Sequence, residues 1–290
     1  MQAPNNNVLP KFSGRPVSSH KQQNSPLDNK HAARPSETRT IVITGTANGI
    51  GLAYLRYYAQ NPLNHVIACD KDPTPLENIP NRRAAVSTHT LEVNDEFFLS
   101  SLSTFLSGRP VHLLIHCVGV RGLNPQVERE APSDVTAAEV LEATGKKMLT
   151  QTFNVNAVGT FEVIRTLLPS LRAASEQLPG EERARVVVMS SRMGSMSQNT
   201  QETTPGGYAY RASKAALNSI VRTFSVDVPD VFFMLIHPGR VNTNLVLCCE
   251  EGSISTDDCV WKLIKIMDAD GVQNLPSGLF WDINGQQIPW

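Results

Sequence analysis

The sequence predicts an α/β fold in which helices cover both faces of a parallel β-sheet. Two observations carry this prediction. Short runs rich in Val, Ile and Leu recur along the chain, and longer stretches with apolar residues at helical spacing separate them. Strands that are buried on both faces read as continuous apolar runs, and this pattern is typical of a parallel sheet between two helical layers.

We expect seven strands, one at each apolar run. They lie at residues 41–43, 65–69, 84–91, 111–117, 185–189, 231–236 and 278–281. Helical spacing predicts a helix through Leu52 and Leu55 to Tyr58, and a second helix at residues 94–106. A long helix that contains residues 153–159 should join the fourth and fifth strands. Another should start after Gly207. The alternation is that of a doubly wound, Rossmann-like single domain.

The composition excludes several classes of protein. Of the 290 residues, 41% are hydrophobic and 18% are charged, with 26 Lys and Arg against 27 Asp and Glu. The apolar content suffices for a core, and the balanced charge argues against a nucleic-acid binder that relies on a basic face. No run of about 18 apolar residues is present, so no membrane span is expected. We therefore expect neither nucleic acid nor membrane as a partner.

The cysteines indicate a reduced compartment. The chain has an odd number of them, five, at Cys69, Cys117, Cys248, Cys249 and Cys259. They show no CxxC spacing, and no cluster of His, Cys, Asp and Glu has the spacing of metal ligands. We expect a cytoplasmic protein without a metal site.

Residues 1–38 differ from the rest of the chain. Pro, Ser, Asn and Gln make up 18 of these 38 residues, and neither Tyr nor Trp is present. Such a segment buries too little apolar surface to offset the entropy of ordering, so we expect a disordered extension before a domain at residues 39–290. Its few acids and several bases leave a mitochondrial presequence as an alternative, and it lacks the apolar core of a secretory signal.

A glycine-rich turn follows the first predicted strand. Residues 44–51 read TGTANGIG. Glycines let the backbone approach a pyrophosphate, and the start of the next helix offers unpaired N–H groups to it. A tight turn uses glycine for geometry alone, so a second signal is needed, and Asp70 supplies it at the end of the second strand. A carboxylate there accepts hydrogen bonds from adenosine ribose hydroxyls.

Asp70 also bears on the choice of cofactor. A 2′-phosphate beside this carboxylate would meet like-charge repulsion, which favours NAD(H) over NADP(H). The glycine turn holds no Arg or Lys that would compensate. Lys71 leaves the NADP(H) alternative open, because its side chain can reach toward a phosphate.

Several polar residues point to acid–base chemistry. Tyr210 and Lys214 are four residues apart, so a helix places both side chains on one face. An ammonium beside a phenol lowers the pKa of the phenol from about 10 and makes it a usable acid–base at neutral pH. The pair Ser190-Ser191 ends the fifth strand, at the sheet edge where ligands bind, and a hydroxyl there can bind a substrate carbonyl. Asn156 lies in the long helix.

In this order the motifs resemble the short-chain dehydrogenase/reductase family over residues 39–290. The motifs are TGxxxGIG, NxxxG, a strand-ending SS, YxxxK and PGxVxT. The resemblance implies that Tyr210 is the general acid–base and that Lys214 lowers its pKa and binds nicotinamide ribose. Ser191 would polarise the substrate oxygen, Asn156 would hold a water in a proton relay, and Thr243 would contact the nicotinamide carboxamide.

The resemblance also implies a set of cofactor-binding residues. They are Gly45, Asn48, Gly49, Ile50, Gly51, Asp70, Glu92, Val93, Cys117, Gly119, Tyr210, Lys214, Pro238, Gly239, Val241 and Thr243. Residues 208–218 (YAYRASKAALN) and the terminal IPW look closest to the C-factor/sniffer-type carbonyl reductases. Where that subgroup has arginines suited to NADP, this chain has Asn48 and Asp70. Its NNAG strand end is HCVG here, at residues 116–119, and its adenine-contacting Asp is Glu92.

The sequence thus predicts an NAD-dependent oxidoreductase that moves a hydride between nicotinamide and a carbonyl or secondary alcohol. The alternative is a non-catalytic dinucleotide-binding sensor or scaffold. We expect residues 120–148 and 244–258 to form the substrate walls, and the resemblance implies a homodimer or homotetramer. His116 is expected to be a structural residue rather than a catalyst. Cys248 and Cys249 are expected to pack, with a redox role as the alternative.

Overall fold

The predicted parallel sheet is present. The structure is a computed structural model, and it describes residues 38–73, 79, 81–178, 182–203, 205–248, 251–269 and 272–290. Within these residues the strands are β1 (Arg39–Thr44), β2 (Asn64–Asp70), β3 (Ala85–Thr90), β4 (Leu113–His116), β5 (Ala184–Met189), β6 (Val231–His237) and β7 (Leu279–Asp282). They form one sheet in the order β3-β2-β1-β4-β5-β6-β7, and each neighbouring pair is parallel. The predicted tail, up to residue 37, lies outside the described residues.

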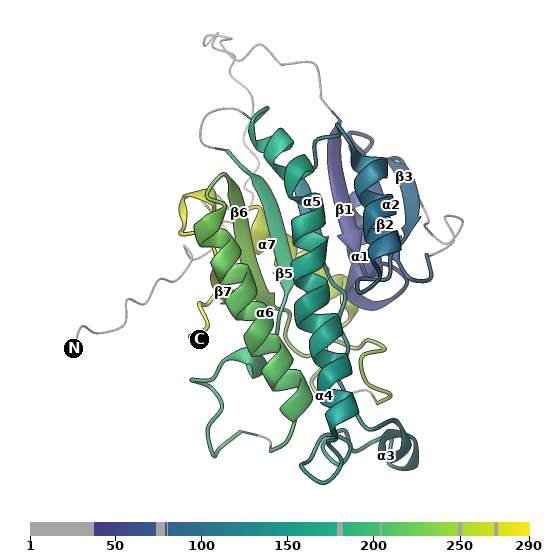
Figure 1. The fold of residues 1–290 in the computed structure, drawn as a ribbon, viewed down its shortest axis with the longest axis vertical. Coiled ribbons are helices and arrows are strands. Elements are labelled where there is room, and N and C mark those ends of the chain that lie inside the picture. The colour runs from purple at the N-terminus through teal and green to yellow at the C-terminus, as the bar shows by residue number, and fades with distance from the viewer. Residues whose placement is uncertain are drawn as a thin grey trace, which may run out of the picture.

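Helices cover both faces of this sheet. One layer holds α1 (Gly49–Tyr58) and α7 (Thr256–Met267), and the other holds α2 (Glu96–Leu106), α5 (Gly159–Ser175) and α6 (Tyr208–Asp227), as Figure 1 shows. Alternate residues of a strand point to opposite faces. In β1, Ile41 and Ile43 therefore pack with α1 and α7, while Val42 packs with the other layer.

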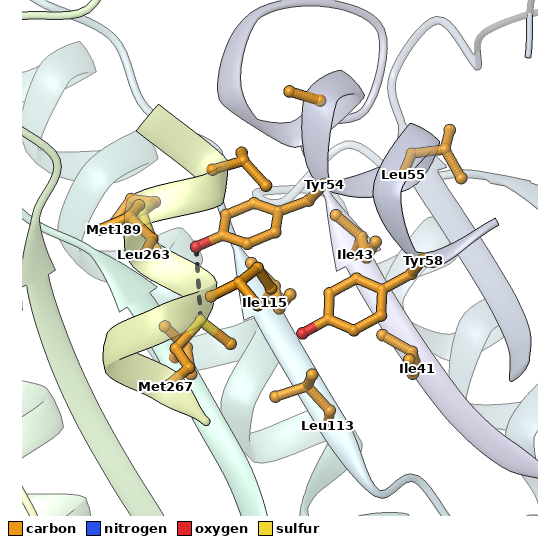
Figure 2. Packing of buried hydrophobic residues seen from close by; sticks show 14 of the residues in the cluster. Ile41, Ile43, Tyr54, Leu55, Tyr58, Leu113, Ile115, Met189, Leu263 and Met267 are labelled. Carbon is orange, nitrogen blue, oxygen red and sulfur yellow. Dashed lines mark hydrogen bonds between the residues drawn. The ribbon is translucent and has the colours of Figure 1, made fainter. Parts of the chain in front are cut away.

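Figure 2 shows the first of these two cores. The rings of Tyr54 and Tyr58 on α1 lie near Ile41 and Ile43 of β1. The Tyr54 hydroxyl donates to the sulfur of Met267 on α7, at 3.4 Å. This layer fixes the start of α1 over the end of β1, which is where the glycine turn lies.

The long helix predicted before β5 is interrupted. The structure has α4 (Lys146–Phe153), a π-helical stretch (Asn154–Val158) and then α5. A π-turn adds a residue to the helical repeat and is frequent at functional sites. It was not predictable from apolar spacing, because the sequence runs through it without a Gly or Pro break.

Other boundaries differ by a few residues. The helix predicted from residue 94 begins at Glu96, because the Asp95 side chain accepts from the N–H of Phe97 and caps it. The strand predicted at residues 111–117 is shorter, since the N–H of Val111 bonds to Ser170 instead of a neighbouring strand. The short helix α3 (Pro125–Glu130) and α7 were not predicted.

The order of the strands predicts a binding crevice at the carboxyl ends of β1 and β4. The chain leaves β1 toward β2 on one side and reaches β4 on the other, so the connections after β1 and β4 diverge. Ligands of open α/β sheets bind at such a switch point, outside the carboxyl ends of the strands. None of the helices in the described part of the chain combines the length and apolar character needed to cross a membrane.

Candidate active site

Two adjoining cavities lie at the carboxyl ends of the strands. The smaller has a volume of about 400 Å³ and runs along the glycine turn and the ends of β2 and β4. The larger has a volume of about 1170 Å³ and lies between the loops that follow β4, β5 and β6. The residues that line both cavities mark their common boundary, and they are Ile50, Ser190, Tyr210, Pro238, Thr243 and Leu245.

The glycine turn forms one wall of the smaller cavity. Gly45 and Gly49 have φ of +76° and +59°, values that side chains disfavour. A Cβ on Gly51 would lie 2.0 Å from the carbonyl oxygen of Gly45, so only glycine fits there. The carboxylate of Asp70 accepts from the N–H of Ala47 at 2.9 Å, which ties the end of β2 to the turn. The turn is thus closed by its own backbone and leaves the start of α1 facing the cavity.

Tyr210 and Lys214 lie in the first two turns of α6, and both are buried. The Lys214 ammonium is 5.7 Å from the centre of the Tyr210 ring and donates to the carbonyl of Met189, at 2.9 Å. Burial lowers the pKa of Lys214 to about 8, and the neighbouring Cys117 thiol opposes this shift. Both side chains line the smaller cavity.

The two serines after β5 have different partners. The Ser190 hydroxyl donates to the amide oxygen of Asn218 on α6, at 2.5 Å. The Ser191 hydroxyl accepts from the N–H of Met193 at 3.2 Å and lines the larger cavity. Because that bond uses only an acceptor lone pair, the Ser191 proton stays available to a substrate oxygen.

Asn156 is the central residue of the π-helical stretch. Its amide nitrogen donates to the carbonyl of Val120 and the hydroxyl of Ser213, at 2.8 and 2.9 Å. Its amide oxygen accepts from the N–H of Val120 at 2.8 Å and keeps a second lone pair. Asn156 therefore joins the loop after β4 to α6, and it lies behind both cavity walls rather than in them.

His116 is fully buried at the end of β4, and its ring bonds on both sides. Nδ1 is 2.8 Å from the hydroxyl of Thr44, and Nε2 is 3.1 Å from the hydroxyl of Thr160. Thr160 donates its own proton to the carbonyl of Asn156, so it must accept from Nε2–H. Burial, with a smaller effect of Lys214, lowers the pKa of His116 to about 3. The ring is thus neutral and joins β1 to α5, as expected of a structural residue.

Sequence reasoning did not single out Arg121, which follows β4. Its guanidinium binds the carboxylate of Glu139 through two bonds of 2.8 and 2.9 Å, and both side chains are largely buried. The same guanidinium lies 4.7 Å from the centre of the Tyr210 ring. No sequence signal could have found this contact, because it joins two irregular loops to a helix far along the chain.

A second arginine lies beside Ser191. The Nε of Arg192 donates to Nε2 of His237 at 2.9 Å, and both residues line the larger cavity. Burial, with Arg192 as the next cause, lowers the pKa of His237 to about 4, so this ring is neutral when it accepts the bond.

The smaller cavity collects most of the residues predicted to bind the cofactor. Its walls include Gly45, Asn48, Gly49, Ile50, Gly51, Asp70, Glu92, Val93, Cys117, Gly119, Tyr210, Lys214, Pro238 and Thr243. Gly239 and Val241 instead line the larger cavity, together with Ser191. Val241 forms an isolated bridge with Ile254, and the chain lines the smaller cavity again from Thr243.

The larger cavity corrects the predicted substrate walls in part. Both predicted ranges contribute to it, whereas Leu123, Val127 and Leu247 do not line it. The residues from the two ranges are Arg121, Ser133, Asp134, Val135, Thr136, Glu139, Leu245, Val246, Cys248, Glu251 and Gly252. Residues 192–203 supply a wall that was not predicted, next to the predicted Ser191. Cys249 and Glu250 lie outside the described residues. Among the described residues, no group of three or more His, Cys, Asp and Glu could hold a metal ion.

Comparison with known proteins identifies a family and a relative of this chain. The family model described as short chain dehydrogenase matches residues 39–251. The C-signal protein of Myxococcus xanthus is 34% identical over 194 residues, which cover 66% of this chain and 100% of that protein.

Two solved structures share the fold. The NADPH-bound carbonyl reductase from chicken fatty liver has a TM-score of 0.71 at 23% identity. The carbonyl reductase Sniffer of D. melanogaster has a TM-score of 0.68 at 20% identity. Each match covers 88% of this chain and 100% of the other.

Proposed function

The chain belongs to the short-chain dehydrogenase family of oxidoreductases, and we propose that it interconverts a carbonyl compound and a secondary alcohol with NAD(H). One observation carries the proposal. Tyr210, at the boundary of two cavities, has Lys214 on the side of the smaller cavity and Ser191 on the side of the larger. An acid–base group in this position can reach a substrate in one cavity while a cofactor occupies the other.

The smaller cavity fits a nicotinamide dinucleotide. The glycine turn has no room for a side chain at Gly51, so the start of α1 stays open to a pyrophosphate. Asp70 and Glu92 supply acceptors along the same wall, where ribose and adenine would lie. Such a cofactor supplies or accepts the hydride when it is bound.

The protein's own residues handle the proton. In the direction of reduction, Tyr210 donates its phenolic proton to the substrate oxygen, and in oxidation the phenolate takes a proton from the alcohol. Ser191 donates a hydrogen bond to the same oxygen and stabilises the charge that develops there. The Lys214 ammonium, fixed by the carbonyl of Met189, favours the phenolate. Asn156, behind the cavity walls, holds the loop after β4 against α6 through Val120 and Ser213.

The preference for NAD(H) rests on Asp70. Its carboxylate lines the smaller cavity while it accepts from Ala47, so it cannot swing away from a bound adenosine without opening the turn. A 2′-phosphate would be repelled from this position. The NADPH in the chicken enzyme is a property of that protein, and Lys71 on the same wall is the residue here that would favour NADPH.

Paired titrations with NADH and NADPH test the cofactor. We expect NADH to bind at least about tenfold more tightly, from quenching of Trp fluorescence, and Asp70→Ser to narrow the difference. Asp72→Ser is the matched control, since Asp72 is exposed and does not line the cavity. Tighter binding of NADPH would overturn the cofactor preference alone. Binding of neither would overturn the proposal as a whole.

Two tyrosines of α6 test the chemistry. We expect Tyr210→Phe to lower turnover on the order of 10²- to 10⁴-fold while NADH binding persists. Tyr208→Phe, at the exposed start of the same helix, should leave turnover unchanged. If a panel of ketones, aldehydes and secondary alcohols gives no turnover although NADH binds, the sensor or scaffold alternative replaces the enzyme.

A further inference from the structure

The Tyr210 ring lies close to two cations. The Lys214 ammonium, at 5.7 Å from the ring centre, belongs to the same helix. The Arg121 guanidinium is closer, at 4.7 Å, and comes from the loop after β4. An arginine within about 6 Å of an aromatic ring is attracted to the face of that ring, more strongly where water is excluded. Arg121 is therefore placed to act on the phenol.

The position of Arg121 is fixed by Glu139. The two bonds between guanidinium and carboxylate hold the arginine in one plane, and only 15% of its side chain and 4% of that of Glu139 are exposed. Glu139 is itself anchored, because its carbonyl accepts from the N–H of Gly207 at 2.8 Å. A Cβ on Gly206 would lie 2.7 Å from that carbonyl oxygen, so the chain before α6 packs closely against Glu139. The pair is thus attached to the start of the helix that carries Tyr210.

We propose that Arg121 is a positioning residue that orients the Tyr210 ring and favours its ionised form. The inference rests on the proposed role of Tyr210 as the acid–base. The positive end of the Arg121–Glu139 pair faces the ring, so it stabilises a phenolate more than a neutral phenol. Because the carboxylate partly offsets the guanidinium, we expect the pair to lower the pH at which Tyr210 ionises by about one unit, at the low end of shifts for close charges.

The other charged groups around Tyr210 define what must be held constant. Arg211, next to it on α6, bonds through Nε to the carbonyl of Gly206, at 3.0 Å. Burial lowers the pKa of Arg211, Glu139 opposes this shift, and Arg121 adds to it. Lys214 stays in every variant below. The buried rings of His116 and His237 are neutral at the pH values of the assay.

Removal of the charged pair is the direct test. Arg121→Gln alone would leave a buried carboxylate without its partner, so the main variant is the double change Arg121→Gln/Glu139→Gln. Ultraviolet absorbance of the phenolate is titrated in each protein and in the same protein carrying Tyr210→Phe. The difference between the two curves reports Tyr210 alone. Burial raises the pKa of the other core tyrosines, Tyr54 and Tyr58, so they ionise later.

We expect the pH at which Tyr210 ionises to rise by about one unit in the double variant. In Arg121→Lys, which keeps Glu139 and a positive charge, this pH should rise by no more than half as much. The acid limb of the pH profile for alcohol oxidation should shift to higher pH by the same amount as the ionisation of Tyr210. An unmoved titration in a folded double variant overturns the inference. If the double variant does not fold, Arg121→Met/Glu139→Leu replaces the pair with apolar groups and is judged by the same shift.

These outcomes separate the inference from the proposed function. The absorbance titration needs neither cofactor nor substrate, so it tests Arg121 even if no substrate is turned over. A wild-type protein without turnover would contradict the proposed function. A shifted titration together with an unmoved pH profile would support the effect of Arg121 on the phenol and would overturn the proposed role of Tyr210 as the acid–base.

Discussion

Replacement of His116 by Gln tests how the end of β4 is built. The folded protein holds the imidazole neutral, with a pKa of about 3 against 6.5 for an ordinary histidine, because the ring is buried between Thr44 and Thr160. Above pH 6.5 the ring is neutral in both the folded and unfolded states and adds no pH dependence. Between pH 6.5 and 3 the unfolded chain binds a proton that the folded chain does not, so stability falls as the pH falls.

The size of the effect follows from the same two values. One proton of difference changes the folding equilibrium constant about tenfold per pH unit. Over two units, from pH 6.5 to 4.5, His116 should therefore cost the wild-type protein on the order of 3 kcal/mol. His116→Gln keeps a polar group at the site but cannot titrate. It should be less stable at pH 7, because an amide cannot reproduce both ring bonds, and should lose less stability on acidification.

Urea unfolding followed by Trp fluorescence at a series of pH values measures this difference. The free energies of unfolding of wild type and variant are compared at each pH, so that the contributions of carboxylates and other histidines to the pH dependence cancel. His89→Gln is the control, because His89 is partly exposed and burial lowers its pKa less far. Parallel curves for wild type and His116→Gln between pH 6.5 and 4.5 would show that the folded ring titrates normally, and would refute the network of Thr44, His116 and Thr160.

Two further predictions concern the cofactor cavity. Gly51→Ala should weaken NADH binding at least about tenfold, because its Cβ would meet the oxygen of Gly45, whereas Gly145→Ala, which has open space, should bind as wild type in the same fluorescence titration. Lys214→Met should abolish turnover yet raise the free energy of unfolding by about 1–3 kcal/mol, since burial disfavours its ammonium. A thermal scan that shows a lower melting temperature for Lys214→Met would contradict this.

The features that the sequence predicted correctly share a physical basis. Strands that are buried on both faces consist of continuous apolar residues, so they can be found in the sequence. In a parallel sheet the carboxyl ends of these strands lie at the same edge. Residues at the ends of different strands or just after them, such as Gly45, Asp70 and Gly119, were therefore expected in one place, and all three line the smaller cavity. Tyr210 and Lys214 were predictable for another reason, because a helix relates residues four apart wherever it lies.

The features that were missed depend on irregular backbone. Arg121 and Glu139 lie on the long connection between β4 and α4, where no period relates one side chain to the next. Their contact with each other and with Tyr210 follows from the path of that loop. The π-helical stretch around Asn156 was also hidden, because apolar spacing predicts a helix but does not show where its hydrogen-bond pattern shifts by one residue.

The altered strand end, HCVG, is where the sensor or scaffold alternative would find support, but its structure is continuous with the rest of the candidate site. His116 bonds to Thr44, at the start of the glycine turn, and through Thr160 to the carbonyl of Asn156. Asn156 then binds Val120 and the α6 residue Ser213. One continuous set of bonds thus runs from the glycine turn to α6, the helix that carries Tyr210 and Lys214, which we propose as the catalytic pair. With His at position 116, the strand end thus keeps the glycine turn and the start of α6 in register, which the proposed enzyme requires.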